Sequence, residues 1–121
     1  MTRDAALYNF FSDFGMTAYP ATAVPAKADF PYITYETTGG DWGTSVSIAV
    51  NLWFHTESEA FPNAKVTQIS EAVGLGGKII PHDNGMIWVT RGNPWVQAFA
   101  DETDNSFKRR QLILILEDWR T

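Results

Sequence analysis

The sequence contains no cysteine and only two histidines, His55 and His82. The absence of cysteine excludes disulfide frameworks and thiolate metal sites, and it suits a reducing compartment. Neither histidine has a partner at the i, i+4 spacing of a helical zinc site, so we expect both to be ordinary surface residues. No Gly-x-Ser-x-Gly segment occurs either. The residues therefore indicate no catalytic site, no metal site and no cofactor.

Positive charge and long apolar segments are also scarce. Nine basic residues stand against fourteen acidic ones, for a formal net charge of −5. Modules that bind duplex DNA normally show a basic face, but the only basic cluster is 108–110, beside a strongly apolar segment. The longest apolar run, Leu112 to Leu116, is far too short to span a bilayer, and residues 1–4 begin no signal peptide. We expect no specific DNA binding, no membrane contact and a cytoplasmic location.

Aromatic residues are well represented. They make up 14% of the 121 residues and include five tryptophans and eight phenylalanines. Each ring buries a large area, so a chain of this length can build a substantial core. Its length is close to the commonest size for one domain. We therefore expect a single domain over residues 1–121.

Two segments show helical periodicity. In 3–14, large apolar side chains recur at i, i+3, i+4 and i+7, with Thr2 as a suitable N-cap and Gly15 as a suitable C-terminal residue. A second apolar stripe predicts a helix over 58–73, which Ser58 can cap.

Other segments alternate or are rich in β-branched and aromatic residues, which is typical of strands. The final strand is apolar on both faces and is expected at the centre of the sheet. The order of elements predicts an α+β fold: a mostly antiparallel sheet with two helices packed on one face. The predicted strands cover 32–38, 45–55, 86–91, 95–100 and 107–119, with 16–19 and 78–80 as optional additions.

Loops between the strands hold the candidate interface residues. Trp42 lies in a hairpin loop and Trp95 follows a Gly-Asn-Pro turn. Tryptophans on turns are candidate interface anchors, and local packing over a sheet edge is the alternative. The acidic loop 101–105 reads as a solvated hairpin loop, with a docking surface and a cation site as alternatives. The candidate interface residues are Asp41, Trp42, Trp95, Asp101, Glu102 and Asp104.

Four segments resemble small proteins encoded beside the tail genes of siphophages and prophages. The likeness covers about residues 5–118, and the proteins concerned are tail terminators or closely related head–tail joining proteins. The segments are FPYITYE (30–36), VNLWFHTES (50–58), IWVTRGNP (87–94) and DETDN (101–105).

The resemblance implies a subunit that forms a homo-oligomeric ring, usually a hexamer. Such a ring caps the tail tube, contacts tail-tube and head-completion proteins, and lets DNA pass without reading it. It is assembled in the host cytoplasm and ends at the head–tail junction of the virion. The alternatives are a head-closure or adaptor protein of the same neck, and a small cytoplasmic ligand-binding protein.

Overall fold

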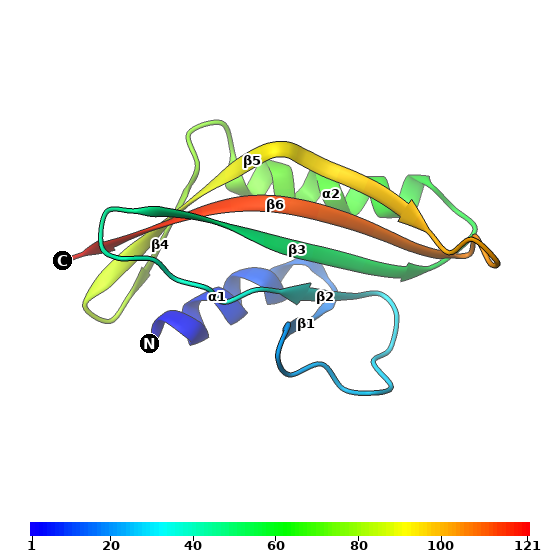
Figure 1. The fold of residues 1–121 in the computed structure, drawn as a ribbon, viewed down its shortest axis with the longest axis horizontal. Helices are drawn as coiled ribbons and strands as arrows, with labels where there is room; N and C mark the ends of the chain where they lie inside the picture. The colour runs from blue at the N-terminus through cyan, green and yellow to red at the C-terminus, as the bar shows by residue number, and fades with distance from the viewer.

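A six-stranded sheet forms the centre of the structure, a computed structural model that describes residues 1–121. The strand order is β1-β2-β3-β6-β5-β4, and β1–β2 is the one parallel pair. Figure 1 shows β3, β6 and β5 as long neighbouring strands. The elements are α1 (Arg3–Phe11), the 3-10 turn η1 (Ser12–Phe14), β1 (Thr17–Pro20), β2 (Tyr32–Tyr35), β3 (Ser45–His55), α2 (Ala60–Val73), β4 (Lys78–His82), β5 (Gly85–Ala100) and β6 (Phe107–Arg120).

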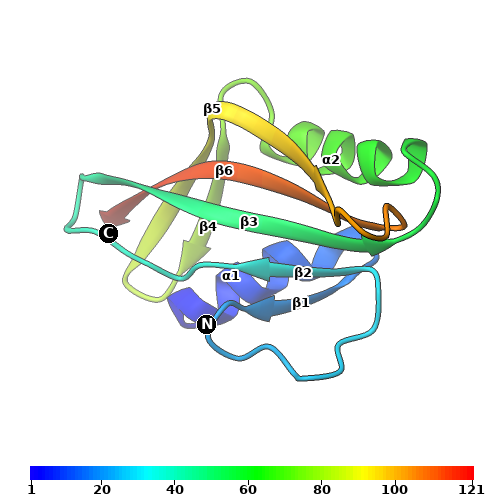
Figure 2. The same cartoon turned by 45° about the vertical axis from the view of Figure 1, so that its right-hand side comes forward.

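Both helices pack on one face of the sheet, which confirms the predicted α+β fold (Figures 1 and 2). Arg110 and Asp118 of β6 are an even number of positions apart, so their side chains point to the same face. Arg110 binds Glu59 at the start of α2, and Asp118 binds Arg3 of α1. The other face carries no helix, and we call it the open face. Neither α1 nor α2 has the length and apolar composition that a membrane-spanning helix needs.

The first helix follows the sequence prediction closely. The Thr2 hydroxyl accepts a hydrogen bond from the Ala5 N–H at 3.1 Å, and Gly15 ends the segment at a φ of +73°. Its last three predicted residues form η1 instead of α-helix. Leu7, Phe11 and Phe14 are buried against the sheet.

The second helix begins at Ala60, two residues later than predicted. Two local hydrogen bonds fix the turn before it: the Ser58 hydroxyl accepts from the Phe61 N–H at 3.2 Å, and the Thr56 hydroxyl accepts from the Ser58 N–H at 3.1 Å. The predicted apolar stripe is buried, and it consists of Pro62, Val66, Ile69 and Val73.

The strand β6 lies inside the sheet, between β3 and β5, as its apolar sequence predicts. Leu112, Leu114 and Leu116 are buried under the helices, whereas Ile113 and Ile115 are half-buried on the open face. β6 is apolar on both faces because one face packs under the helices and the other forms a half-exposed apolar strip on the open face.

The predicted strands 86–91 and 95–100 are one continuous strand, β5. Arg91 pairs with Leu114 and Val96 with Leu112, so four residues of β5 stand opposite one residue of β6. The Gly-Asn-Pro segment is thus a bulge within a strand, not a turn, because pairing with β6 resumes beyond it.

The predicted strand 32–38 ends early, at Tyr35. The carbonyls of Thr37 and Thr38 accept hydrogen bonds from Arg3 at 2.9 and 3.2 Å, so they are not available to a neighbouring strand. Both sheet edges are short and contain proline: Pro20 ends β1, and Pro81 lies within β4. Such edges disfavour growth of the sheet by pairing with another chain.

Candidate functional site

Four side chains form a row across the open face, at the end of the sheet near the acidic loop. Tyr32 pairs with Trp53, Trp53 with Arg109, and Arg109 with Phe99, so the row crosses β2, β3, β6 and β5. Cross-strand neighbours on one face of a sheet lie close enough for large side chains to touch. We call these four residues the cross-strand row.

Arg109 lies between the two aromatic rings of this row. Its guanidinium carbon is 4.3 Å from the centre of the Phe99 ring and 5.4 Å from that of Trp53. One nitrogen, Nη1, donates to the Asn51 side-chain oxygen at 3.2 Å. No carboxylate of the chain pairs with this guanidinium. The aromatic faces stabilise the cation, and its charge stays available to an external anion.

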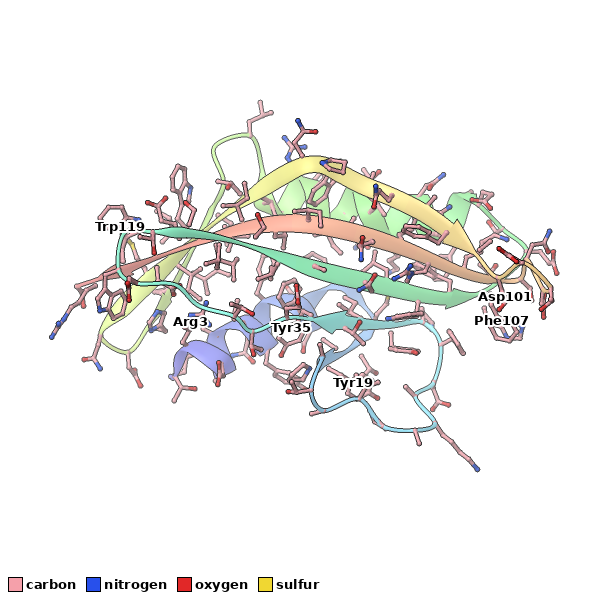
Figure 3. All side chains as sticks on the ribbon, in the orientation of Figure 1. Arg3, Tyr19, Tyr35, Asp101, Phe107 and Trp119 are labelled. Carbon is pink, nitrogen blue, oxygen red and sulfur yellow. The ribbon has the colours of Figure 1, made fainter.

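Further rings extend the row towards the end of the sheet. His55 stacks on Phe107 with 4.2 Å between ring centres, and Phe30 lies 5.7 Å from Phe107. Burial, followed by the neighbouring Tyr19, raises the pKa of the Tyr32 phenol above its usual value of 10.0. Figure 3 shows Phe107 and Asp101 at this end.

A cavity of about 560 Å³ lies among these side chains, and we call it the aromatic hollow. Its volume is within the range of about 300–1,000 Å³ that is typical of ligand pockets. Its lining is Phe30, Tyr32, Trp53, Phe54, Phe99, Ala100, Asp101, Phe107, Lys108 and Arg109.

The basic cluster 108–110 is divided between the two faces of β6. Lys108 and Arg110 are buried on the helix-covered face, where both form ion pairs with Glu59. The hydrogen bond from Arg110 holds the pKa of the Glu59 carboxyl below its usual value. Only Arg109 reaches the open face, because consecutive side chains of a strand point to opposite faces. The cluster is therefore not a basic surface patch.

Two carboxylates of the acidic loop 101–105 bind the loop itself. Asp101 accepts hydrogen bonds from the Thr103 N–H and hydroxyl at 2.9 and 2.7 Å, and Asp104 accepts from the Ser106 N–H and hydroxyl at 3.0 and 2.6 Å. The hydroxyl bonds and then the N–H bonds hold the pKa of each aspartate below its usual value. Glu102 is exposed. This geometry fits a structured hairpin loop. Nowhere in the chain do three or more His, Asp or Glu side chains lie close enough together to hold a metal ion.

Asp41 and Trp42 lie at the opposite end of the sheet, in the loop between β2 and β3. The Gly43 N–H donates to the Asp118 carbonyl at 2.7 Å, which fixes this loop beside the end of β6. Trp42 is 51% exposed, and Trp119 of β6 is 43% exposed. Figure 3 shows Trp119 at the end of the molecule away from Asp101 and Phe107.

The predicted interface residues do not form one cluster. Asp41 and Trp42 occupy one end of the sheet, and Asp101 and its neighbours occupy the other. Trp95 lies between them and is not on a turn: it packs half-buried against the core, with Arg91 5.9 Å from its ring. This local packing is the alternative given above for Trp95, and a role of Trp95 in an interface stays a prediction.

The aromatic hollow was not predicted from the sequence. Its signal was present in the odd positions of the two long strands: 53 and 55 in β3, and 107 and 109 in β6, all point to the open face. Their convergence depends on the pairing of Trp53 with Arg109, which no local pattern specifies.

The two histidines differ in their surroundings. His55 is exposed and stacks on Phe107. His82 is half-buried: Nδ1 lies 2.8 Å from the Asp83 carbonyl oxygen, and Nε2 is buried without a hydrogen-bond partner.

The hollow combines apolar ring faces with the Arg109 guanidinium, which has no carboxylate partner. Its other charged lining residues are already engaged: Lys108 pairs with Glu59, and the Asp101 carboxylate accepts hydrogen bonds from Thr103. Such a site suits a group that is apolar or aromatic and carries a nearby negative charge. No family model matches the sequence, and no curated protein matches it.

Proposed function

We propose that this chain is a structural subunit of a phage tail: a tail terminator whose copies form a ring, usually of six, at the head–tail junction. The observation that carries the proposal is the open face, which has exposed large apolar side chains at both ends. Exposed apolar patches on a small domain are typical of surfaces that bind other proteins. The exposed large apolar residues of this face are Ile79, Trp88, Phe99, Phe107 and Trp119, with Phe30 and Trp42 beside them.

The two ends of the open face differ in chemistry, which favours a ring. One end has the aromatic hollow with Arg109, and the other has exposed tryptophans beside the carboxylate of Asp41. Contacts between unlike patches generate closed rings when the rotation between copies closes. The short, proline-containing edges of the sheet direct association to its face instead.

The electrostatics suit a conduit for DNA. The net charge is −5, and two of the three clustered basic residues are buried against Glu59. A lumen that shows few free cations does not retain the phosphate backbone. DNA would pass through the ring without specific contacts.

The resemblance to tail-gene products also includes head-closure and adaptor proteins of the same neck. The partner separates these functions: a terminator binds the tail tube, whereas an adaptor binds the proteins on the portal side. The aromatic hollow favours one further candidate, a small-ligand-binding protein. Its volume and its convergent Arg109 are those of a ligand pocket.

Light scattering over a range of concentrations, with and without tail-tube protein, tests the proposal. We expect a closed ring, formed alone at high concentration or at lower concentration with the tube. Leu75→Ser removes a 97% exposed leucine that lies in the loop after α2, and this variant should assemble like the wild type. A chain that stays monomeric at every concentration, with or without tube protein, contradicts the ring.

A further inference from the structure

We infer that the loop tip Asp41–Trp42 of one copy docks in the aromatic hollow of the next copy, where the Asp41 carboxylate pairs with Arg109. This inference rests on the proposed ring, because it names the contact that would repeat around it. It assigns an occupant to the hollow and a role to the predicted interface residues of the loop tip.

Charge complementarity is the first argument. Arg109 has no carboxylate partner in its own chain, and its one polar side-chain contact is Asn51. The Asp41 carboxylate likewise has no partner: only its backbone carbonyl is engaged, by the N–H and hydroxyl of Thr44. A second copy supplies to each group the charge that the monomer lacks. Arg–carboxylate pairs of this kind are stronger than neutral hydrogen bonds.

Shape and polarity are the second argument. The indole of Trp42 is half exposed beside the free carboxylate, which matches what the hollow accepts: a ring for the aromatic faces and an anion for the guanidinium. Three contacts hold the loop before docking: Arg3 binds the Thr37 and Thr38 carbonyls, and the Gly43 N–H binds Asp118. Such preorganisation lowers the entropy cost of association.

The positions of the two surfaces are the third argument. The tip lies beside Trp119 and the hollow beside Phe107, at opposite ends of the molecule (Figure 3). A copy therefore cannot fill its own hollow, and each copy can use both surfaces at once. That arrangement is a head-to-tail contact, and such contacts form a ring when the rotation from copy to copy returns to the first copy.

Charge reversal tests the pairing. Asp41→Arg alone and Arg109→Asp alone each place like charges in the contact. We expect each variant to self-associate at least about 30-fold more weakly than the wild type. A one-to-one mixture of the two variants restores a complementary pair at every contact, so it should assemble, as should the double variant. The matched control is Glu71→Arg, the same charge change at an exposed position of α2, which should assemble like the wild type.

Cross-linking gives a second measurement that does not depend on charge. The chain has no cysteine, so Asp41→Cys mixed with Phe99→Cys can form a disulfide only between copies. We expect cross-linked pairs from the mixture and none from Phe99→Cys with wild type. Melting scans of each variant show whether it is folded, and the cross-link remains decisive if Arg109→Asp does not fold.

The outcomes separate this contact from the proposed function. Rings that form normally with either reversed charge, and give no cross-link, overturn the contact and leave the ring. A closed dimer that responds to both reversals supports the contact and contradicts the ring. Loss of tube binding by Arg109→Asp, with unchanged self-assembly of Asp41→Arg, makes the tube protein the occupant and overturns the inference. A wild type that stays monomeric with and without tube protein contradicts both.

Discussion

The guanidinium of Arg3 in α1 lies 2.7 Å from the carboxylate of Asp118 in β6, 115 positions further along the chain. The Asp118 side chain is only 4% exposed, and that of Arg3 is 21% exposed. The same guanidinium binds the carbonyls of Thr37 and Thr38. One residue thus joins the first helix, the central strand and the loop that carries Trp42.

We expect Arg3→Ala to lower the free energy of unfolding by about 3 kcal/mol, because it leaves the Asp118 carboxylate buried without a counter-charge. Urea unfolding monitored by tryptophan fluorescence measures the change. Asp118→Asn is the control: it removes the buried charge and leaves Arg3 able to reach water, so it should cost less. Equal losses for the two variants would show that the buried carboxylate is not the cause.

Leu114→Asp should unfold the domain, because Leu114 is fully buried under the helices. An unpaired carboxylate in that position costs several kcal/mol, which is comparable to the whole stability of a small domain. Ile115→Asp, one position further on the open face, should fold with a moderately lowered melting temperature. Circular dichroism melting scans compare the two, and similar behaviour would contradict the assignment of their faces.

Gly92→Ala should destabilise the bulge of β5. A Cβ at this position would lie 2.5 Å from the Ile113 Cγ2 atom and 2.9 Å from the Ile113 carbonyl oxygen. We expect a loss of about 1–3 kcal/mol, as for other overpacked sites. Gly76→Ala, whose Cβ would meet nothing within 4 Å, should be close to neutral in the same melting scan. A neutral Gly92→Ala would mean that the bulge is not closely packed on β6.

The acidic loop should lose its stability in acid. The pKa of Asp104 is lowered from its usual value of 3.8 by hydrogen bonds from Ser106. Because the folded-state pKa lies below the unfolded one, the stabilisation is full above pH 3.8 and is lost as the pH falls through the folded-state value.

Amide hydrogen exchange of residues 103–107, measured from about pH 6 down to about pH 3, follows this loss of stability. Asp104→Asn keeps an oxygen acceptor without a titrating group, so the protection of its loop should vary less with pH once the intrinsic exchange rate is removed. Identical pH profiles for the two proteins would exclude Asp104 as the titrating group.

Duplex DNA should bind weakly or not at all at physiological salt. The net charge is −5, and Lys108 and Arg110 are buried and pair with Glu59. Fluorescence anisotropy of a labelled duplex over a range of salt concentrations measures the affinity. A salt-sensitive complex of micromolar affinity would contradict the conduit.

The sequence by itself determined the two helices, the strands β3 and β6, and the inner position of β6. These features depend on local causes: apolar periodicity, the Thr2 cap, the Gly15 terminus and alternation along 45–55. The same local reading failed at Gly92 to Trp95, where proline and glycine are typical of a turn. Pairing of the flanking residues with β6 makes a bulge there instead.

Only the tertiary structure decided where the candidate site lies. The register of β2, β3, β6 and β5 brings Tyr32, Trp53, Arg109 and Phe99 into one row, although they lie far apart in the chain. Strand alternation then separates Arg109 from its two basic neighbours, which pair with Glu59 on the other face. Local sequence fixes the direction of each side chain along its own strand, but the pairing between distant strands fixes which side chains meet.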